Sequence, residues 1–147
     1  MSSQSQFGHS NFTNAIEIQQ QLEREIQQSY IKTRTLNGKD TTYVEWFTIV
    51  QMANNIFGED GWSNEITECV VDSITCENGI YEVTCTVQLR VYLKNGVVRE
   101  DVGCGIGIDK EKGNSVISAR KVAVSDALKR TLRLFGNNLG NHFDPIK

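Results

Sequence analysis

The sequence has 147 residues, of which 39% are apolar and 22% are charged, so it is long enough and apolar enough to fold around one core. No apolar run approaches the roughly 20 residues of a membrane-spanning helix, so no membrane segment is expected. The first fifteen residues lack the basic and apolar regions of a secretion signal. This composition excludes a chain that is disordered along its whole length.

Charge is unevenly distributed along the sequence, although the net charge is only −3. Residues 1–109 carry 7 Lys and Arg against 15 Asp and Glu, whereas residues 110–133 carry 7 against 2. A polyanion responds to the local field of a groove, so the acidic average does not exclude phosphate binding. A solvated helix face would show the same basic segment, and charge alone leaves both readings open.

The N-terminal part of the sequence is predicted to contain a leader, one helix and a polar loop. Residues 1–14 are rich in Ser, Gln and Asn, which predicts a disordered leader before a single domain at residues 15–147. Apolar residues spaced by four predict an amphipathic helix from Ala15 to about Tyr30. Residues 32–42 are polar and contain an Asn-Gly turn signal, so a loop is expected there.

A second helix is predicted to open with the capping box Thr42-Tyr43-Val44-Glu45 and to end at Phe57, before Gly58. Trp46 and Trp62 have apolar neighbours, and we interpret both as core anchors and not as base-stacking platforms.

The hydrophobic period then changes to two, which predicts strands over residues 66–75, 80–93 and 97–107. Asn-Gly dipeptides, which favour type I′ hairpin turns, separate these strands. In the middle strand, apolar residues share one face and polar residues share the other, which is typical of a half-buried antiparallel sheet. Cys85 falls on the apolar face, so we interpret it as a structural thiol.

A third helix is predicted from about Ser115 to Phe135. Its small apolar residues form the buried stripe, and its basic residues project from the opposite arc. Arg120 falls inside the stripe and would need an acceptor or an interface, because an unpaired buried charge is very costly. The predicted fold class is therefore α+β: a three-stranded antiparallel β-sheet packed on a long α-helix, a β-β-β-α core with N-terminal flanking helices.

Several residue patterns argue against enzyme chemistry. The run Gly103–Gly107 reads GxGxG on a strand, which fits close approach of another backbone better than a phosphate cradle. The cysteines and histidines lack the clustering of a zinc site, so no metal is expected. A nucleophilic Cys104–His142 pair is conceivable, but nothing in the sequence orients it. We therefore expect no catalytic residues and no cofactor.

Basic and aromatic residues are the remaining candidates for a functional site in this sequence. Arg34 and Tyr43 flank the polar loop, and the last helix carries a group of cations, Lys121, Lys129, Arg130 and Arg133. A groove lined by such groups follows a phosphate backbone without reading base sequence.

Residues 100–141 carry a longer ordered motif. Its members are Glu100-Asp101-Val102-Gly103-x-Gly105, Ala119-Arg120-Lys121-x-Ala123-Val124, Asp126-x-Leu128-Lys129-Arg130 and Leu132-Arg133-x-Phe135-Gly136-Asn137-x-Leu139-Gly140-Asn141. Upstream matches include Tyr30-Ile31-x-x-Arg34, Tyr43-x-Glu45, Ala53-Asn54-x-x-Phe57-Gly58 and Gly61-Trp62. Over roughly residues 22–141, the chain closely resembles the annealing domain of the Rad fifty-two family of recombination proteins.

The resemblance implies an oligomeric ring that binds single-stranded DNA in a basic groove. It implies ATP-independent annealing of complementary strands in double-strand break repair by homologous recombination. The inner-groove residues of the family fall on Arg34, Tyr43, Lys121, Lys129, Arg130 and Arg133. The second, outer DNA site falls on Lys94 and Lys110, with Lys112 close by. The implied location is the nucleus in a eukaryote and the cytoplasm otherwise.

Three departures from the family pattern are visible. Trp46 stands where the family usually has a small residue, and the loop between Arg34 and Tyr43 is slightly short. The sequence stops at Lys147, before the family tail that binds a recombinase and a single-strand-binding protein, so those partners are not carried over.

Two alternatives from other classes remain open at the level of sequence. A double-stranded RNA-binding module shares the α-β-β-β-α order, although residues 44–135 are longer than expected for it. A small enzyme that uses Cys104 as its nucleophile is the other.

Overall fold

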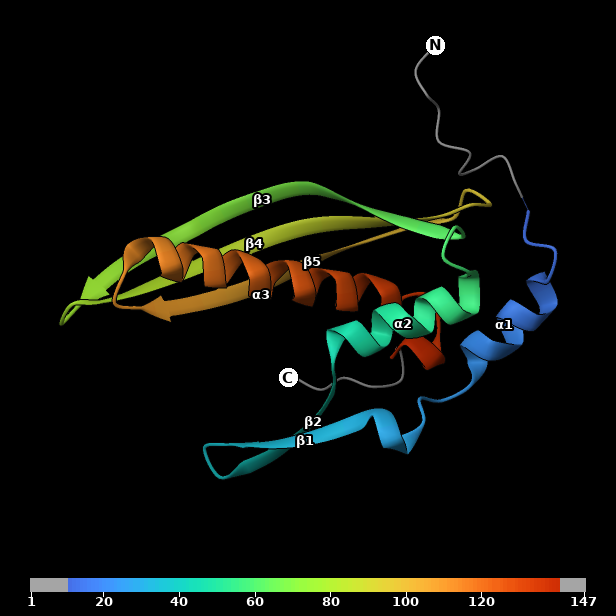
Figure 1. Cartoon of the computed structure of the whole chain (residues 1–147), viewed down its shortest axis with the longest axis horizontal. Helices are drawn as coiled ribbons and strands as arrows, with labels where there is room; N and C mark the ends of the chain where they lie inside the picture. Colours follow the sequence, from blue (N-terminus) through green and yellow to red (C-terminus); the bar gives the residue numbers. More distant parts are fainter. Residues whose placement is uncertain (1–10, 141–147) are drawn as a thin grey trace, which may run out of the picture. The chain divides into compact units, whose positions relative to one another are not determined.

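The computed structural model describes residues 11–140 (Figure 1). Most of the predicted leader therefore lies outside the described residues, as does His142. The elements, in chain order, are α1 (Ala15–Glu23), η1 (Gln28–Tyr30), β1 (Ile31–Leu36), β2 (Lys39–Val44), α2 (Trp46–Phe57), β3 (Trp62–Glu77), β4 (Ile80–Leu93), β5 (Val98–Asp109), α3 (Lys112–Arg133) and η2 (Asn137–Leu139). None of the helices within residues 11–140 has the length and apolar character to cross a membrane.

The described residues divide into two compact units. Unit 1 comprises residues 11–63, 92–99 and 132–140, and unit 2 comprises Asn64–Val91 and Glu100–Thr131. Strands β3–β5 and helix α3 contribute residues to both units.

Unit 2 is built on the antiparallel sheet, in the strand order β3-β4-β5, with α3 lying along one face (Figure 1). Strand β4 alternates between buried and more exposed residues, as its period of two predicts. Cys85 is 1% exposed among the buried residues of β4, which confirms its place in the core. The predicted α+β fold class, with three antiparallel strands packed on a long helix, is confirmed.

Glycines on β5 let α3 approach the sheet closely. A Cβ atom added at Gly103, Gly105 or Gly107 would overlap backbone atoms of α3. These glycines are the positions of close backbone approach that their pattern indicated, and each substitution would push the helix off the sheet.

Helix α3 begins three residues earlier than predicted, and its buried stripe repeats every four residues. The stripe runs through Ser115, Ala119, Ala123, Ala127 and Thr131. The Thr131 hydroxyl donates to the Ala127 carbonyl oxygen at 2.7 Å, which satisfies this buried polar side chain. Arg120 is exposed, so its predicted place inside the stripe is wrong: a stripe that advances by four residues leaves position 120 outside it.

Unit 1 corrects the prediction for the first helix. Helix α1 ends at Glu23, and Arg24 is already extended with ψ 146°. Ile26 is buried although it lies outside the helix. The apolar spacing of four residues therefore predicted the burial of Ile26 correctly, but its prediction of helix beyond Glu23 is wrong. The Asn137 side-chain amide donates to the Glu23 carbonyl oxygen at 3.3 Å, which satisfies one of the carbonyls that a helix end leaves open.

The predicted polar loop at residues 32–42 is instead part of an antiparallel hairpin of β1 and β2. Asn37 and Gly38 have φ angles of 53° and 75°, as a tight hairpin turn requires. The predicted helix opening at residues 42–45 is wrong, because residues 42–44 belong to β2 and the Glu45 side chain makes no cap hydrogen bond.

Helix α2 buries its apolar face in unit 1. Phe57 packs edge-on against Phe135, with ring centroids 5.6 Å apart. Trp62 is half-buried and its indole N–H donates to the Asn54 side-chain oxygen at 2.7 Å, as suits a core anchor. Trp46 is 46% exposed, so the interpretation of Trp46 as a core anchor is wrong.

Candidate nucleic-acid interface

The β1–β2 hairpin brings Arg34 and Tyr43 together. The guanidinium carbon of Arg34 lies 5.2 Å from the centre of the Tyr43 ring, within the range of a cation–π interaction. Arg34 is exposed and Tyr43 is half-buried, so the ring supports the cation while leaving it open to solvent. Two residues that are nine positions apart in sequence thus form one basic and aromatic feature.

The hairpin register extends this feature into a basic face. Lys32 pairs with Tyr43, Arg34 with Thr41, and Leu36 with Lys39. Paired residues share a face and alternate residues along a strand share a face, so Lys32, Arg34 and Lys39 lie on the same side as Tyr43. We call the residues Lys32, Arg34, Lys39 and Tyr43 the hairpin face. It carries three exposed cations and no carboxylate.

Sequence reasoning missed Lys32 and Lys39. The alternation of Lys32 with Arg34, and of Lys39 with Tyr43, on either side of an Asn-Gly turn was the available signal. It went unused because these short strands lack the apolar residues that normally reveal a period of two.

Helix α3 carries the remaining predicted inner-groove residues. Lys121 is exposed, whereas Lys129, Arg130 and Arg133 are half-buried. Neighbouring Ala127, Leu128, Thr131 and Leu132 are buried, so the three C-terminal cations occupy the opposite arc, as predicted.

Arg130 is partly neutralised by an acidic neighbour. Its Nε lies 2.9 Å from the Asp126 Oδ2, and the same carboxylate oxygen accepts the backbone N–H of Cys104 at 3.0 Å. The carboxylate therefore links α3 to β5 and fixes the Arg130 side chain at the surface of the helix.

The predicted groove residues fall in both units. Arg34, Tyr43 and Arg133 belong to unit 1, whereas Lys121, Lys129 and Arg130 belong to unit 2. Their convergence in one groove stays a prediction.

The outer-site residues are also divided between the units. Lys94 in unit 1 follows β4, with its Nζ 4.8 Å from the centre of the Phe12 ring. Its backbone N–H donates to the Gly61 carbonyl oxygen at 3.0 Å. In unit 2, Lys110 and Lys112 are exposed just before and at the start of α3.

One of the four cysteines, Cys85, is buried, and the other three are exposed. Burial, and then a hydrogen bond with Cys69, raises the pKa of Cys85 to about 11, which keeps it a neutral thiol near pH 7. The Cys104 Sγ is exposed and lies 3.9 Å from the Thr86 Oγ1. No group of three potential metal ligands occurs within residues 11–140.

The sequence is similar to one family of known proteins over most of its length. The pattern of the Rad52/22 family, described as double-strand break repair proteins, matches residues 14–144. The chain is 40% identical over 130 residues to the DNA repair and recombination protein RAD52 of Eremothecium gossypii, covering 87% of this chain and 30% of that protein. It is 39% identical over 127 residues to the RAD52 of Saccharomyces cerevisiae, covering 85% and 27% of the two chains.

A similar match extends to the DNA repair and recombination protein rad22 of Schizosaccharomyces pombe, with 37% identity over 129 residues that cover 84% of this chain and 27% of that protein. The chain thus spans less than a third of the length of these relatives. Because the family pattern covers most of the sequence, the chain belongs to the Rad52/22 family of double-strand break repair proteins.

Proposed function

We propose that this chain binds single-stranded DNA and anneals complementary strands without ATP, as an oligomeric ring in double-strand break repair by homologous recombination. The hairpin face carries the proposal, because three exposed cations beside an aromatic ring are the groups that hold an unpaired, negatively charged strand. The names of its relatives, DNA repair and recombination proteins, support the same setting.

In the proposed mechanism, the protein neutralises and positions the strand. Arg34 and Tyr43 line an inner groove together with the α3 cations Lys121, Lys129, Arg130 and Arg133. Phosphate contacts release counterions and carry no sequence information, so a bound strand can shift its register. Watson–Crick pairing with a second strand then provides the specificity and the driving force. This mechanism needs no covalent step, no catalytic residue and no nucleotide hydrolysis.

A second strand is proposed to approach through the outer site, formed by Lys94, Lys110 and Lys112. The ammonium of Lys94 is held against Phe12, and Lys110 and Lys112 flank the start of α3. Cations at this site would offset repulsion between the two DNA backbones while their bases test complementarity.

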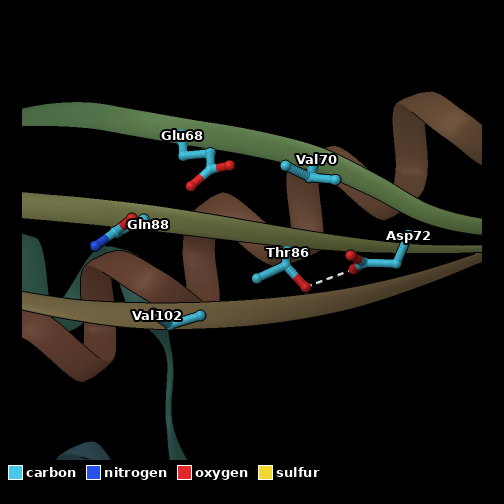
Figure 2. Close-up of a pocket in the computed structure, with 6 residues that line it drawn as sticks. All are labelled: Glu68, Val70, Asp72, Thr86, Gln88 and Val102. Atoms are coloured by element: carbon cyan, nitrogen blue, oxygen red, sulfur yellow. Dashed lines mark hydrogen bonds between the residues drawn. The ribbon is translucent and has the colours of Figure 1, made fainter.

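Self-association is proposed from the open face of the sheet in unit 2. Figure 2 shows Val70 on this face between Glu68 and Asp72, and Val102 beyond the polar side chains of Thr86 and Gln88, with α3 behind the strands. Ile106 and Ile108 continue a row of exposed apolar residues from Val102 along β5, and Ile108 is 63% exposed. An apolar surface of this kind marks an interface in soluble proteins.

A second copy of this chain suits that surface. The solvent side of α3 exposes Ile117 and Val122 beside the basic residue Arg120. Apolar residues with basic neighbours on one copy would complement the apolar residues with acidic neighbours on the open sheet face of the next. Such a head-to-tail contact generates a ring when its rotation closes.

The experiment mixes two complementary, differently labelled oligonucleotides with the protein in the absence of ATP, and measures native mass on the same sample. We expect faster pairing with the protein than without it, and a mass of several chains. A non-complementary pair serves as the control. Pairing at the spontaneous rate, despite full binding of single strands, would refute annealing; a monomer mass would refute the ring.

We also propose that the protein acts in the nucleus, because the compared relatives are DNA repair proteins of eukaryotes.

A further inference from the structure

Two aromatic residues at the start of α2 are exposed side by side. Trp46 is 46% exposed and Phe47 is 55% exposed, and their ring centroids are 6.2 Å apart with an interplanar angle of 80°. Two large adjacent rings are costly to leave in water, whereas single exposed apolar residues are common. The pair therefore forms an exposed apolar surface that would gain free energy if a ligand covered it.

The position of this pair relative to the hairpin face suggests its ligand. Trp46 follows Tyr43 by three residues, so their Cα atoms are at most about 11 Å apart. Both lie in unit 1, together with Lys32, Arg34 and Lys39. A strand whose phosphates contact the hairpin face would thus bring its bases within reach of Trp46 and Phe47.

We infer that Trp46 and Phe47 form a stacking platform for unpaired bases of the single strand held at the hairpin face. The inference rests on the proposed binding of single-stranded DNA and adds a contact to the bases. Aromatic rings stack on any base, so the platform would be tolerant of sequence, as an annealing protein requires. It also separates two roles in unit 1: the hairpin cations hold phosphates, and the rings hold bases.

The test compares an oligothymidylate with an abasic oligonucleotide of the same length, which has the same phosphates and no bases. Binding is measured by fluorescence anisotropy at one salt concentration. We expect the native chain to bind the oligothymidylate about tenfold more tightly than the abasic strand, as stacking of one or two bases provides. In the double variant Trp46→Ala with Phe47→Ala, this ratio should fall to about threefold or less, with abasic binding unchanged.

Two control variants separate stacking from general effects. Ile16→Ala removes an exposed apolar side chain elsewhere in unit 1, at a residue that is 78% exposed, and should leave the ratio unchanged. Trp46→Phe keeps an aromatic ring and should retain most of the preference. In a Trp62→Phe background, Trp46 is the sole tryptophan, and its fluorescence should be quenched by the oligothymidylate and not by the abasic strand.

The outcomes distinguish this inference from the proposed function. Equal binding of both strands by the native chain would overturn the platform while leaving single-strand binding intact. An unchanged ratio in the double variant would also overturn it, and a simultaneous change in native mass would identify the rings as a protein contact. If the native chain binds neither strand, the proposed function fails and the platform fails with it.

Discussion

Asp126 and Arg130 form an ion pair one turn apart on α3, and the Asp126 carboxylate also accepts the backbone N–H of Cys104. The carboxylate thus places a negative charge among cations that we propose to contact DNA. Replacing Asp126 by Asn removes this charge and keeps an oxygen that can accept from Cys104. We expect single-strand affinity to rise several-fold at low salt, because one more cation becomes effective toward phosphate.

The measurement is a salt titration of binding, with Glu25→Gln as a control that removes an exposed charge in unit 1. The half-exposed ion pair contributes about 1 kcal/mol or less, so Asp126→Asn should leave the fold intact. A fall in affinity of the folded variant would show that Asp126 orients Arg130 toward DNA and that its charge is not inhibitory.

The hairpin face makes a second prediction. Arg34→Ala should weaken binding of single strands and reduce the magnitude of the salt slope by about 0.7, the share of one phosphate contact on a single strand. Thr33→Ala is the matched control, because Thr33 is exposed on the opposite face of the same strand. Equal behaviour of the two variants would place the bound strand away from the hairpin face.

The cations that sequence reasoning missed give a third prediction. Changing Lys32 and Lys39 together to Ala should reduce the magnitude of the salt slope by about 1.4, because each phosphate contact on a single strand contributes about 0.7. The same titration of Lys32→Arg with Lys39→Arg should restore the slope, because charge and not side-chain shape makes the contact. If the double Ala variant has the same salt slope as the native chain, the DNA contact of the hairpin face is limited to Arg34 and Tyr43.

Local patterns account for the parts of the fold that could be predicted. Strand β4 has the predicted bounds, Ile80–Leu93, because its alternation is supported by burial on one face and by an Asn-Gly turn before it. The cationic arc of α3 follows from helical spacing alone. Both features depend on residues that are close in sequence.

The features that could not be predicted either lack a local hydrophobic pattern or run against it. Ile26 is buried in an extended segment, which a helical spacing cannot distinguish from a longer helix. The hairpin face emerges only from the pairing of β1 with β2, whose polar residues give no hydrophobic period. Exposure of Trp46 runs against its apolar neighbours, and such a local exception is expected at a functional site.

Close packing of β5 on α3 gives a fourth prediction, on stability. Gly105→Ala adds a Cβ that overlaps backbone atoms of Ala119 and Ala123, so the helix must shift. We expect a loss of about 1–3 kcal/mol in the free energy of unfolding, measured by urea denaturation. Gly113→Ala is the contrasting variant, because no atom lies within 4 Å of the added Cβ and the residue is helical. It should stabilise the chain by up to about 1 kcal/mol.

The buried thiol of Cys85 gives a prediction on pH dependence. Burial raises its pKa from the ordinary 9.0 to about 11, so the unfolded chain releases this proton at lower pH than the folded chain. The raised pKa therefore contributes stability that is fully present below pH 9 and is lost as the pH rises through about 11.

Cys85→Ala should be less stable than the native chain at pH 8, because it loses core packing. The difference in unfolding free energy should shrink steadily between pH 9 and pH 11, as the native chain loses the contribution that the variant lacks. Val83→Ala, which removes core packing from the same strand without removing a thiol, is the matched control and should show no such convergence. A difference between native chain and Cys85→Ala that stays constant over this pH range would mean that the Cys85 thiol ionises in the folded chain as readily as in the unfolded one.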